Sequence, residues 1–145
     1  MGGFDGKAEI GGWLDVYDPE SDSWATIEFG ADGKKGPGPR SVACLLPLKV
    51  AGKEGLVTLF GESDPSNLGH QGAGKMLEDA WWWDMKAQRW EMVEWEVDNR
   101  KRPVGRGWYA SDVWRVADGA DRIVVGGGLN EENERQDDVW MMEVV

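Results

Sequence analysis

Reactive and metal-binding side chains are scarce in this chain of 145 residues, which contains one cysteine and one histidine. The lone Cys44 cannot form an internal disulfide bond, which predicts a reducing, cytoplasmic environment. Cys44 also lies in an apolar run, where a structural thiol is favoured over a nucleophile. The lone His70 excludes a metal site with two histidines. Neither a Ser/His/Asp constellation nor a Cys-x-x-Cys pair is present, so these two kinds of catalytic site are not expected.

Positive charge is also in short supply. The chain has 16 lysine and arginine residues against 27 aspartate and glutamate residues, a net charge of −11. This balance argues against a nucleic-acid partner, which needs a basic face, and against adsorption to an anionic membrane. No apolar run reaches the length of a membrane span, and no signal peptide is visible. Because the first residues look like the inside of a repeat, we expect the chain to begin partway through a larger architecture.

What the sequence does contain is a repeat. Four pairs of like residues share an offset of 66 positions: Asp18 and Asp84, Trp24 and Trp90, Arg40 and Arg106, and Gly61 and Gly127. Repeats of this length are typical of solenoids, propellers and arrays, in which one unit cannot bury its own apolar face. We therefore expect equivalent positions to have equivalent environments, with both tryptophans of the pair largely buried.

Short apolar runs separated by Gly, Asp, Asn and Pro predict strands, and no helix is expected. The predicted strands are Trp13 to Tyr17, Trp24 to Phe29, Val42 to Val50, Leu56 to Phe60, Ala80 to Trp83, Trp90 to Val97, Trp108 to Val116, Arg122 to Val125, and Val139 to Val145. They predict a unit of four consecutive strands, named a, b, c and d. Residues 1–30 supply c and d of one unit, 40–97 a complete unit, and 106–145 strands a to c of the next. Repeated four-stranded units describe the blades of an all-β propeller, here about two and a half blades.

One connection between strands b and c departs from the pattern. The segment 62–78 carries roughly eight more residues than its counterparts, and it holds His70 together with Glu62 and Asp64. Long loops on a regular scaffold are where function usually concentrates. The segment therefore holds the first candidate site.

Several of these motifs resemble kelch repeats. They are the apolar strand that ends in glycines (Val124 to Gly127), the pair Asp138 and Val139 before Trp140, the run Asp15 to Pro19 followed by Trp24, and Pro-x-x-Arg before strand a. The resemblance covers nearly the whole chain and implies a kelch-type β-propeller. In place of the glycine pair, the middle unit has Phe60 and then Gly61.

The inserted segment resembles the long loop of the nitrile-specifier, thiocyanate-forming and epithiospecifier-like kelch proteins. Those proteins act on unstable glucosinolate breakdown products with ferrous iron, and their proposed ligands follow Glu-xxx-Asp-xxx-His. Glu62 and His70 match the outer positions, Ser66 stands where the central Asp belongs, and Asp64 is the nearest carboxylate. The resemblance implies an Fe²⁺ site at these four residues. The alternative is a surface loop whose histidine caps a turn.

Arg40 and Arg106 end the connections between strands d and a, so a propeller would place them at the channel mouth beside Glu62 and His70. Their planar guanidinium groups suit sulfate, phosphate or carboxylate, and the resemblance implies that they hold a sulfate-bearing substrate. Alternatively, they pair with acidic loop residues or cap backbone carbonyls.

Two functions remain open from the sequence. The first is a specifier-like activity on a small sulfate-bearing molecule. The second is a non-catalytic kelch module that binds a protein partner. In either case, further blades or self-association would be needed to close the propeller, because open blade faces expose unpaired strands and apolar surface. The run Trp81 to Trp83 is expected to pack between adjacent blades on both of its faces.

Overall fold

The protein is described by a computed structural model that covers residues 1–68, 72–94, 102–115 and 121–144. Within these ranges the chain forms strands and no helix, which confirms the all-β class. None of the described segments is a helix with the length and apolarity that crossing a membrane would require.

Eleven strands make up the described fold, and all of their pairings are antiparallel. They are β1 (Trp13–Asp18), β2 (Ser23–Glu28), β3 (Leu46–Val50), β4 (Lys53–Leu59), β5 (Glu62–Asp64), β6 (Lys75–Met76), β7 (Ala80–Asp84), β8 (Arg89–Met92), β9 (Ala110–Trp114), β10 (Arg122–Gly126) and β11 (Val139–Glu143).

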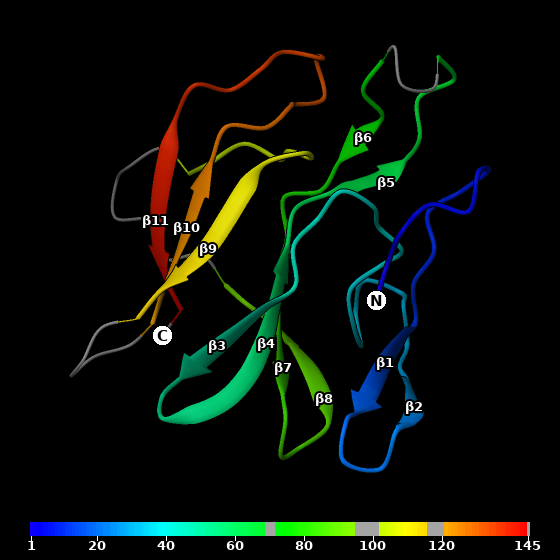
Figure 1. Ribbon diagram of the computed structural model, residues 1–145. Helices are drawn as coiled ribbons and strands as arrows, with labels where there is room; N and C mark the ends of the chain where they lie inside the picture. Colours follow the sequence, from blue (N-terminus) through cyan, green and yellow to red (C-terminus); the bar gives the residue numbers. More distant parts are fainter. Residues whose placement is uncertain (69–71, 95–101, 116–120, 145) are drawn as a thin grey trace.

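The strands form three main sheets in chain order. The hairpin sheet is β1-β2, the central sheet is β3-β4-β7-β8, and the three-stranded sheet is β9-β10-β11. In Figure 1 the three sheets stand beside one another, with the central sheet in the middle. The order inside each sheet follows the a-to-d scheme: the central sheet supplies all four strands, the hairpin sheet c and d, and the three-stranded sheet a to c. No sheet among the described residues closes on itself.

Local turn chemistry explains why the c and d strands form hairpins. Asp84 accepts hydrogen bonds from the backbone N–H groups of Lys86 and Ala87, both at 2.8 Å, and these bonds lower the pKa of its carboxyl group. The turn then ends on Gln88 in the left-handed conformation, with φ of 51°. Asp22, 66 positions earlier, has the same φ of 51°. The repeat in sequence is therefore a repeat in backbone geometry.

The core lies between the sheets rather than within any one of them. Trp81, Trp82 and Trp83 on β7 are all buried. Trp82 belongs to an apolar cluster shared with the three-stranded sheet, where its partners include Ile123 and Val125. Trp81 and Trp83 belong to a second cluster that includes Leu14 of the hairpin sheet. The expected packing of the tryptophan run on both faces of the sheet is confirmed.

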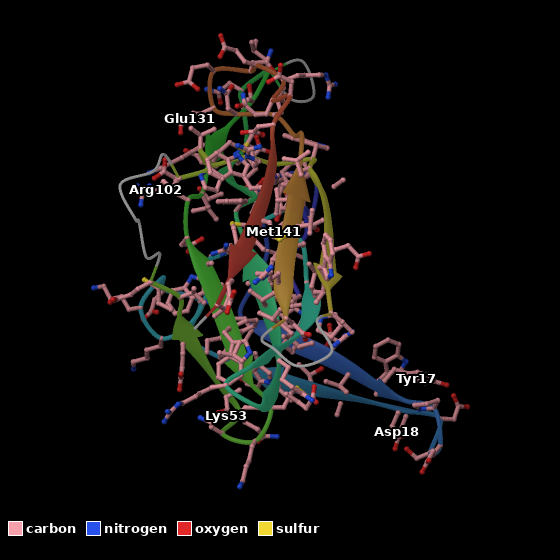
Figure 2. The ribbon with its side chains drawn as sticks, turned by 90° about the vertical axis from the view of Figure 1, so that its left-hand side faces the viewer. Tyr17, Asp18, Lys53, Arg102, Glu131 and Met141 are labelled. Carbon is pink, nitrogen blue, oxygen red and sulfur yellow. The ribbon has the colours of Figure 1, made fainter. Side chains whose placement is uncertain are left out.

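The expectation for the tryptophan pair at the start of strand d is half wrong. Trp90 is 5% exposed, but Trp24 is 71% exposed. The register is nevertheless the same, because Trp24 lies opposite Tyr17 as Trp90 lies opposite Trp83. Figure 2 shows the cause: the tip of the hairpin sheet, marked by Tyr17 and Asp18, projects away from the rest of the described molecule.

Two differences from the predicted strands and loops bear on the site. The run 42–50 is paired only from Leu46, because Val42 has a left-handed backbone with φ of 48° that interrupts an extended strand. The segment 62–78, predicted as a loop, contains the small hairpin β5-β6. The ends of the predicted strands at residues 95–97, 116 and 145 lie outside the described residues.

Candidate functional site

Arg40 is nearly inaccessible, with 2% of its surface exposed. Its Nη1 and Nη2 atoms donate to the two carboxylate oxygens of Asp79 at 2.8 and 2.9 Å. Nη1 also donates to the carbonyl oxygen of Phe60 at 3.1 Å, and Nε to that of Gly38 at 3.1 Å. Every nitrogen of the guanidinium group thus has an acceptor within the chain. The fork-to-fork pairing is the geometry that makes arginine–carboxylate bonds strong.

Arg106 repeats this arrangement in the three-stranded sheet. It is 0% exposed and makes a bidentate pair with Asp138, in which Nη2 lies 3.0 Å from Oδ2. Nη1 donates to the carbonyl of Gly127 and Nε to that of Val104, both at 3.0 Å. The hydrogen bonds from Arg106 hold the pKa of Asp138 below its usual value.

The two aspartates are fixed by a further repeated contact. The indole Nε1 of Trp81 donates to Asp79 at 2.7 Å, and that of Trp140 donates to Asp138 at 2.6 Å. Both arginines therefore adopt the structural alternative, pairing with acidic residues and capping carbonyls. A role for Arg40 and Arg106 in holding an anionic substrate stays a prediction, and it would require these buried pairs to open.

The backbone of each arginine joins two units. The carbonyl of Arg40 accepts the N–H of Gly3 at 2.8 Å, and the carbonyl of Arg106 accepts the N–H of Gly61 at 2.9 Å. Each side chain holds its own unit together, whereas each carbonyl binds the glycine of the unit before. The position equivalent to Gly61 in the third unit is Gly128, because both have φ near +100° (96° and 102°).

By backbone conformation, Gly61 is therefore equivalent to Gly128 and not to Gly127, the residue at the 66-position offset. Phe60, with φ of 54°, is the counterpart of Gly127, with φ of 67°. The shift arises within the strand a to strand b hairpins, because Leu46 and Val57 pair 11 positions apart and their equivalents Asp112 and Val124 pair 12 positions apart. Phe60 thus occupies a left-handed position where the third unit has glycine, a conformation that disfavours a bulky side chain.

The inserted segment is defined by three equivalent bridges that close the connection between strands b and c. Phe4 pairs with Glu9, Glu62 with Met76, and Leu129 with Arg135. The bridged residues lie 5, 14 and 6 positions apart. The expected insertion of about eight residues in the middle unit is confirmed, and it follows directly after the glycine turn at Gly61.

Glu62 lies at the base of this insertion and is 6% exposed. Its Oε1 accepts the backbone N–H of Gly74 at 2.6 Å, from the returning limb of the loop. A Cβ at position 74 would lie 2.5 Å from the same oxygen and 1.8 Å from the carbonyl oxygen of Asp64. Glycine at 74 is therefore required for the two limbs to approach, and the carboxylate of Glu62 fixes their relative position.

The other predicted metal ligands are less clearly assembled. Asp64 is exposed, and the Oγ of Ser66 accepts the backbone N–H of Leu68 at 3.1 Å. His70 lies outside the described residues. Among the residues that are described, no group of three or more His, Cys, Asp and Glu side chains is placed to hold a metal ion. Ferrous iron binding stays a prediction that depends on His70.

A pocket of about 330 Å³ lies where the inserted segment meets the starts of the a strands. Its lining residues are Gly3, Phe4, Ser41, Val42, Glu62, Pro65, Ser66 and Trp108. All three units contribute to it. Two of the predicted site residues, Glu62 and Ser66, share this pocket, whereas the side chains of Arg40 and Arg106 are buried in their ion pairs.

Sequence reasoning missed the aromatic walls of the pocket, Phe4 and Trp108. A signal for Trp108 was present: it follows Arg106 by two positions, as Val42 follows Arg40. Both residues have left-handed backbones, with φ of 48° for Val42 and 52° for Trp108. The N–H of Trp108 donates to the carbonyl of Val42 at 3.2 Å, which brings the two strand starts together.

A buried carboxylate lies behind the pocket. The Oγ of Ser41 lies 3.2 Å from Oε1 of Glu9, to which it donates a hydrogen bond. Glu9 is 8% exposed, and its Oε2 has no hydrogen-bond donor among the described residues. Buried polar atoms are usually satisfied, so an orphan oxygen beside a cavity is a notable feature.

Comparison of the sequence with known protein families gives a negative result. No family model matches it. Any assignment therefore depends on the repeated geometry and on the chemistry of this pocket.

Cys44 does not add a reactive group to the site. It is partly buried against the apolar cluster shared by the central and three-stranded sheets, and burial raises the pKa of its thiol. A raised pKa keeps the sulfur protonated and weakly nucleophilic. The structural interpretation of Cys44 is the one that this environment favours.

Proposed function

We propose that the chain is part of a kelch-type β-propeller and acts as a non-catalytic binding module that recognises a protein partner at the channel mouth. The consecutive order of strands in each sheet and the packing of the sheets through shared tryptophan clusters support the propeller. The repeated arginine–aspartate–tryptophan contacts support equivalent blades, because identical polar networks recur at the same place in two successive sheets.

The observation that carries the binding function is the pocket built by three units and the inserted segment. Its volume of about 330 Å³ suits one small ligand or one long side chain. Within the described residues, one connection between strands b and c is lengthened and forms its own hairpin. The pocket lies beside this connection. Loops carried by a rigid scaffold are the usual place for recognition.

The second candidate is the iron-dependent specifier activity. The observation that favours it is that Glu62 and Ser66, four residues apart on the inserted segment, line one pocket. His70 would supply a neutral imidazole and Asp64 or water a further oxygen ligand, which are donor types suited to ferrous iron. The arginine–aspartate pairs count against a sulfate-bearing substrate, because neither guanidinium group is available at the pocket wall.

A loop replacement tests the binding function. The segment 63–75 is replaced by Asp-Gly-Lys-Ala, the short turn that joins Phe4 to Glu9 in the first unit. The scaffold bridge between Glu62 and Met76 is kept, so the fold should be retained at a loss of about 1–3 kcal/mol, because the buried carboxylate of Glu62 loses the N–H of Gly74. Displayed random peptides are selected on the parent protein, and the enriched peptides are measured against both proteins.

We expect enriched peptides to bind the parent protein and to lose at least tenfold in affinity for the loop replacement. Peptides that bind both proteins equally would contradict a site at the inserted segment. A parent protein that enriches no peptide would contradict the binding function.

The specifier alternative is tested separately by anaerobic titration of ferrous iron, followed by calorimetry. Weak binding to the parent protein, stronger binding to Ser66→Asp and none to His70→Ala would support it. Binding should weaken below about pH 6.5, because only neutral imidazole ligates a metal. A Ser66→Asp variant that binds no more tightly than the parent would exclude this activity.

A further inference from the structure

The walls of the pocket are aromatic and accessible. Phe4 is 46% exposed and Trp108 is 43% exposed, and both line the cavity with Val42 and Pro65. Aromatic faces carry a partial negative charge and attract cations, most strongly for tryptophan. Two exposed aromatic side chains in the lining of a small cavity thus suit a ligand that combines an alkyl chain with a positive charge.

The polar side of the pocket is acidic. Among the described residues that line it, Glu62 is the one charged side chain. Behind Ser41 lies the buried Glu9, whose Oε2 has no donor among the residues that the structure describes. Phe4 and Glu9 lie directly opposite each other in an antiparallel bridge, so their side chains leave the ladder on the same face. A buried carboxylate oxygen without a donor is costly, and a bound cation would offset that cost.

The basic side chains that the structure describes lie outside this cavity. Lysine and arginine are both absent from the part of the lining that the structure describes. Arg40 and Arg106, the nearest repeated basic residues, are each neutralised by a bidentate aspartate. The side chains of Lys7 and Lys75 are exposed and are not part of the described lining. The charge of the described lining is therefore opposite to the one that a sulfate-bearing ligand would need.

We infer that the pocket between Phe4, Trp108 and Glu62 binds an organic cation, an alkyl ammonium or alkyl guanidinium group. The inference rests on the proposed function, because a protein partner would supply this group as a lysine or arginine side chain. The alkyl stem packs between the two aromatic faces. The charged head reaches the carboxylate of Glu62 and, through the Ser41 side, the orphan oxygen of Glu9.

The first experiment uses small probes and follows the indole N–H signal of Trp108 by NMR. Butylammonium and butylguanidinium should shift this signal saturably, and butanol and butyrate should bind at least tenfold more weakly. Glu62→Gln should weaken butylammonium at least tenfold, because it removes the charge while its amide oxygen can still accept the Gly74 N–H. Phe4→Leu should weaken it roughly threefold, because one aromatic face is lost.

Matched controls lie on the hairpin sheet. Glu20→Gln removes a carboxylate, and Trp24→Leu removes an exposed aromatic side chain, both far from the pocket. Neither should alter the affinity. The inference would be overturned if butyrate or butanol bound as tightly as butylammonium. So would an unchanged affinity in both Glu62→Gln and Phe4→Leu. If Glu62→Gln fails to fold, Phe4→Leu still decides, because Phe4 is exposed.

A second arm separates the two sources of the cation and keeps this inference distinct from the proposed function. Each lysine or arginine of a selected peptide is replaced by norleucine. Loop-dependent peptides that keep their affinity after replacement would support the protein-binding function and overturn the cation pocket. Selective butylammonium binding without any loop-dependent peptide would support the pocket as a site for a free amine and contradict the protein-binding function.

Discussion

The hairpins β1-β2 and β7-β8 have the same pattern and different surroundings. In both, an aromatic residue on strand c lies opposite a tryptophan on strand d, with ring centroids 5.1 Å apart for Tyr17 and Trp24 and 5.4 Å for Trp83 and Trp90. Yet Trp24 is exposed and Trp90 is buried. β7 also pairs with β4, and Phe29 packs edge-on against Trp90 at 5.6 Å.

The difference shows that local sequence determines pairing, whereas neighbouring units determine burial. Among the described residues, β1 pairs with β2 alone and has no strand on its other edge. The same side chain therefore contributes to the core in one unit and to the surface in the other.

The largest expected effect comes from the tryptophan pair itself. Trp90→Ala should destabilise the protein by about 3–5 kcal/mol, because it leaves a large cavity between two sheets. Trp24→Ala should cost less than about 1 kcal/mol, because its side chain is already in water. Urea unfolding of both variants measures the difference. Equal losses would mean that Trp24 is covered in solution, for example by a second copy of the chain.

The next effect concerns the buried ion pairs. Arg40→Met removes the ion-pair partner of Asp79 and one hydrogen-bond donor to the carbonyl of Phe60, which should cost about 2–4 kcal/mol. The exposed pair between Arg89 and Glu91 is the counterpart, and Arg89→Met should cost less than about 0.5 kcal/mol. Thermal unfolding of the two variants provides the measurement. A loss below 1 kcal/mol for Arg40→Met would show that its pair contributes little.

A smaller effect is expected at the tyrosine hydroxyls. Tyr109 donates to the carbonyl of Leu59 at 2.5 Å and accepts the N–H of Cys44 at 3.0 Å, so it ties the three-stranded sheet to the central sheet. Tyr109→Phe should cost about 1–3 kcal/mol, because a partly buried N–H loses its partner. Tyr17→Phe, which removes only an exposed bond to Asp22, should be nearly neutral. Denaturant titration of the matched pair tests this, and equal effects would argue against the bridging role.

The smallest effect is a dependence on pH. Arg106 lowers the pKa of Asp138 in the folded state. A lowered folded-state pKa contributes stability that is present above the unfolded value, about 3.9. This stability is lost as pH falls through the folded pKa. Asp138→Asn should therefore lose less stability between pH 5 and pH 3 than the parent does. A parallel loss in both proteins, measured by urea unfolding at each pH, would contradict this contribution.

Much of the fold could be predicted from the sequence because short-range chemistry determines it. The a-to-d order followed from the strand runs and the 66-residue offset, and the tryptophan run identified the interfaces between sheets. The burial of single residues and the candidate site were harder to predict. Trp24 could not be assigned to the surface, since its exposure depends on what lies beyond the hairpin.

The roles of the arginines also could not be settled from the sequence. A guanidinium group at a channel mouth suits an anion, and only the geometry shows that Asp79 and Asp138 lie within reach of it. The pocket wall at Phe4 was equally hidden, because it depends on a contact between units separated by long stretches of sequence. The role of His70 as a metal ligand stays a prediction, since His70 lies outside the described residues.

The double attachment of each repeated arginine has a consequence for cooperativity. The side chain of Arg106 forms hydrogen bonds within the third unit, and its backbone carbonyl accepts the N–H of Gly61 in the middle unit. Neither unit can therefore open at this point without straining the other. Stacked repeats share their stability mainly through such nearest-neighbour links. Units joined in this way should unfold together, and amide hydrogen exchange at Gly3 and Gly61 should report the opening of the following unit rather than of their own.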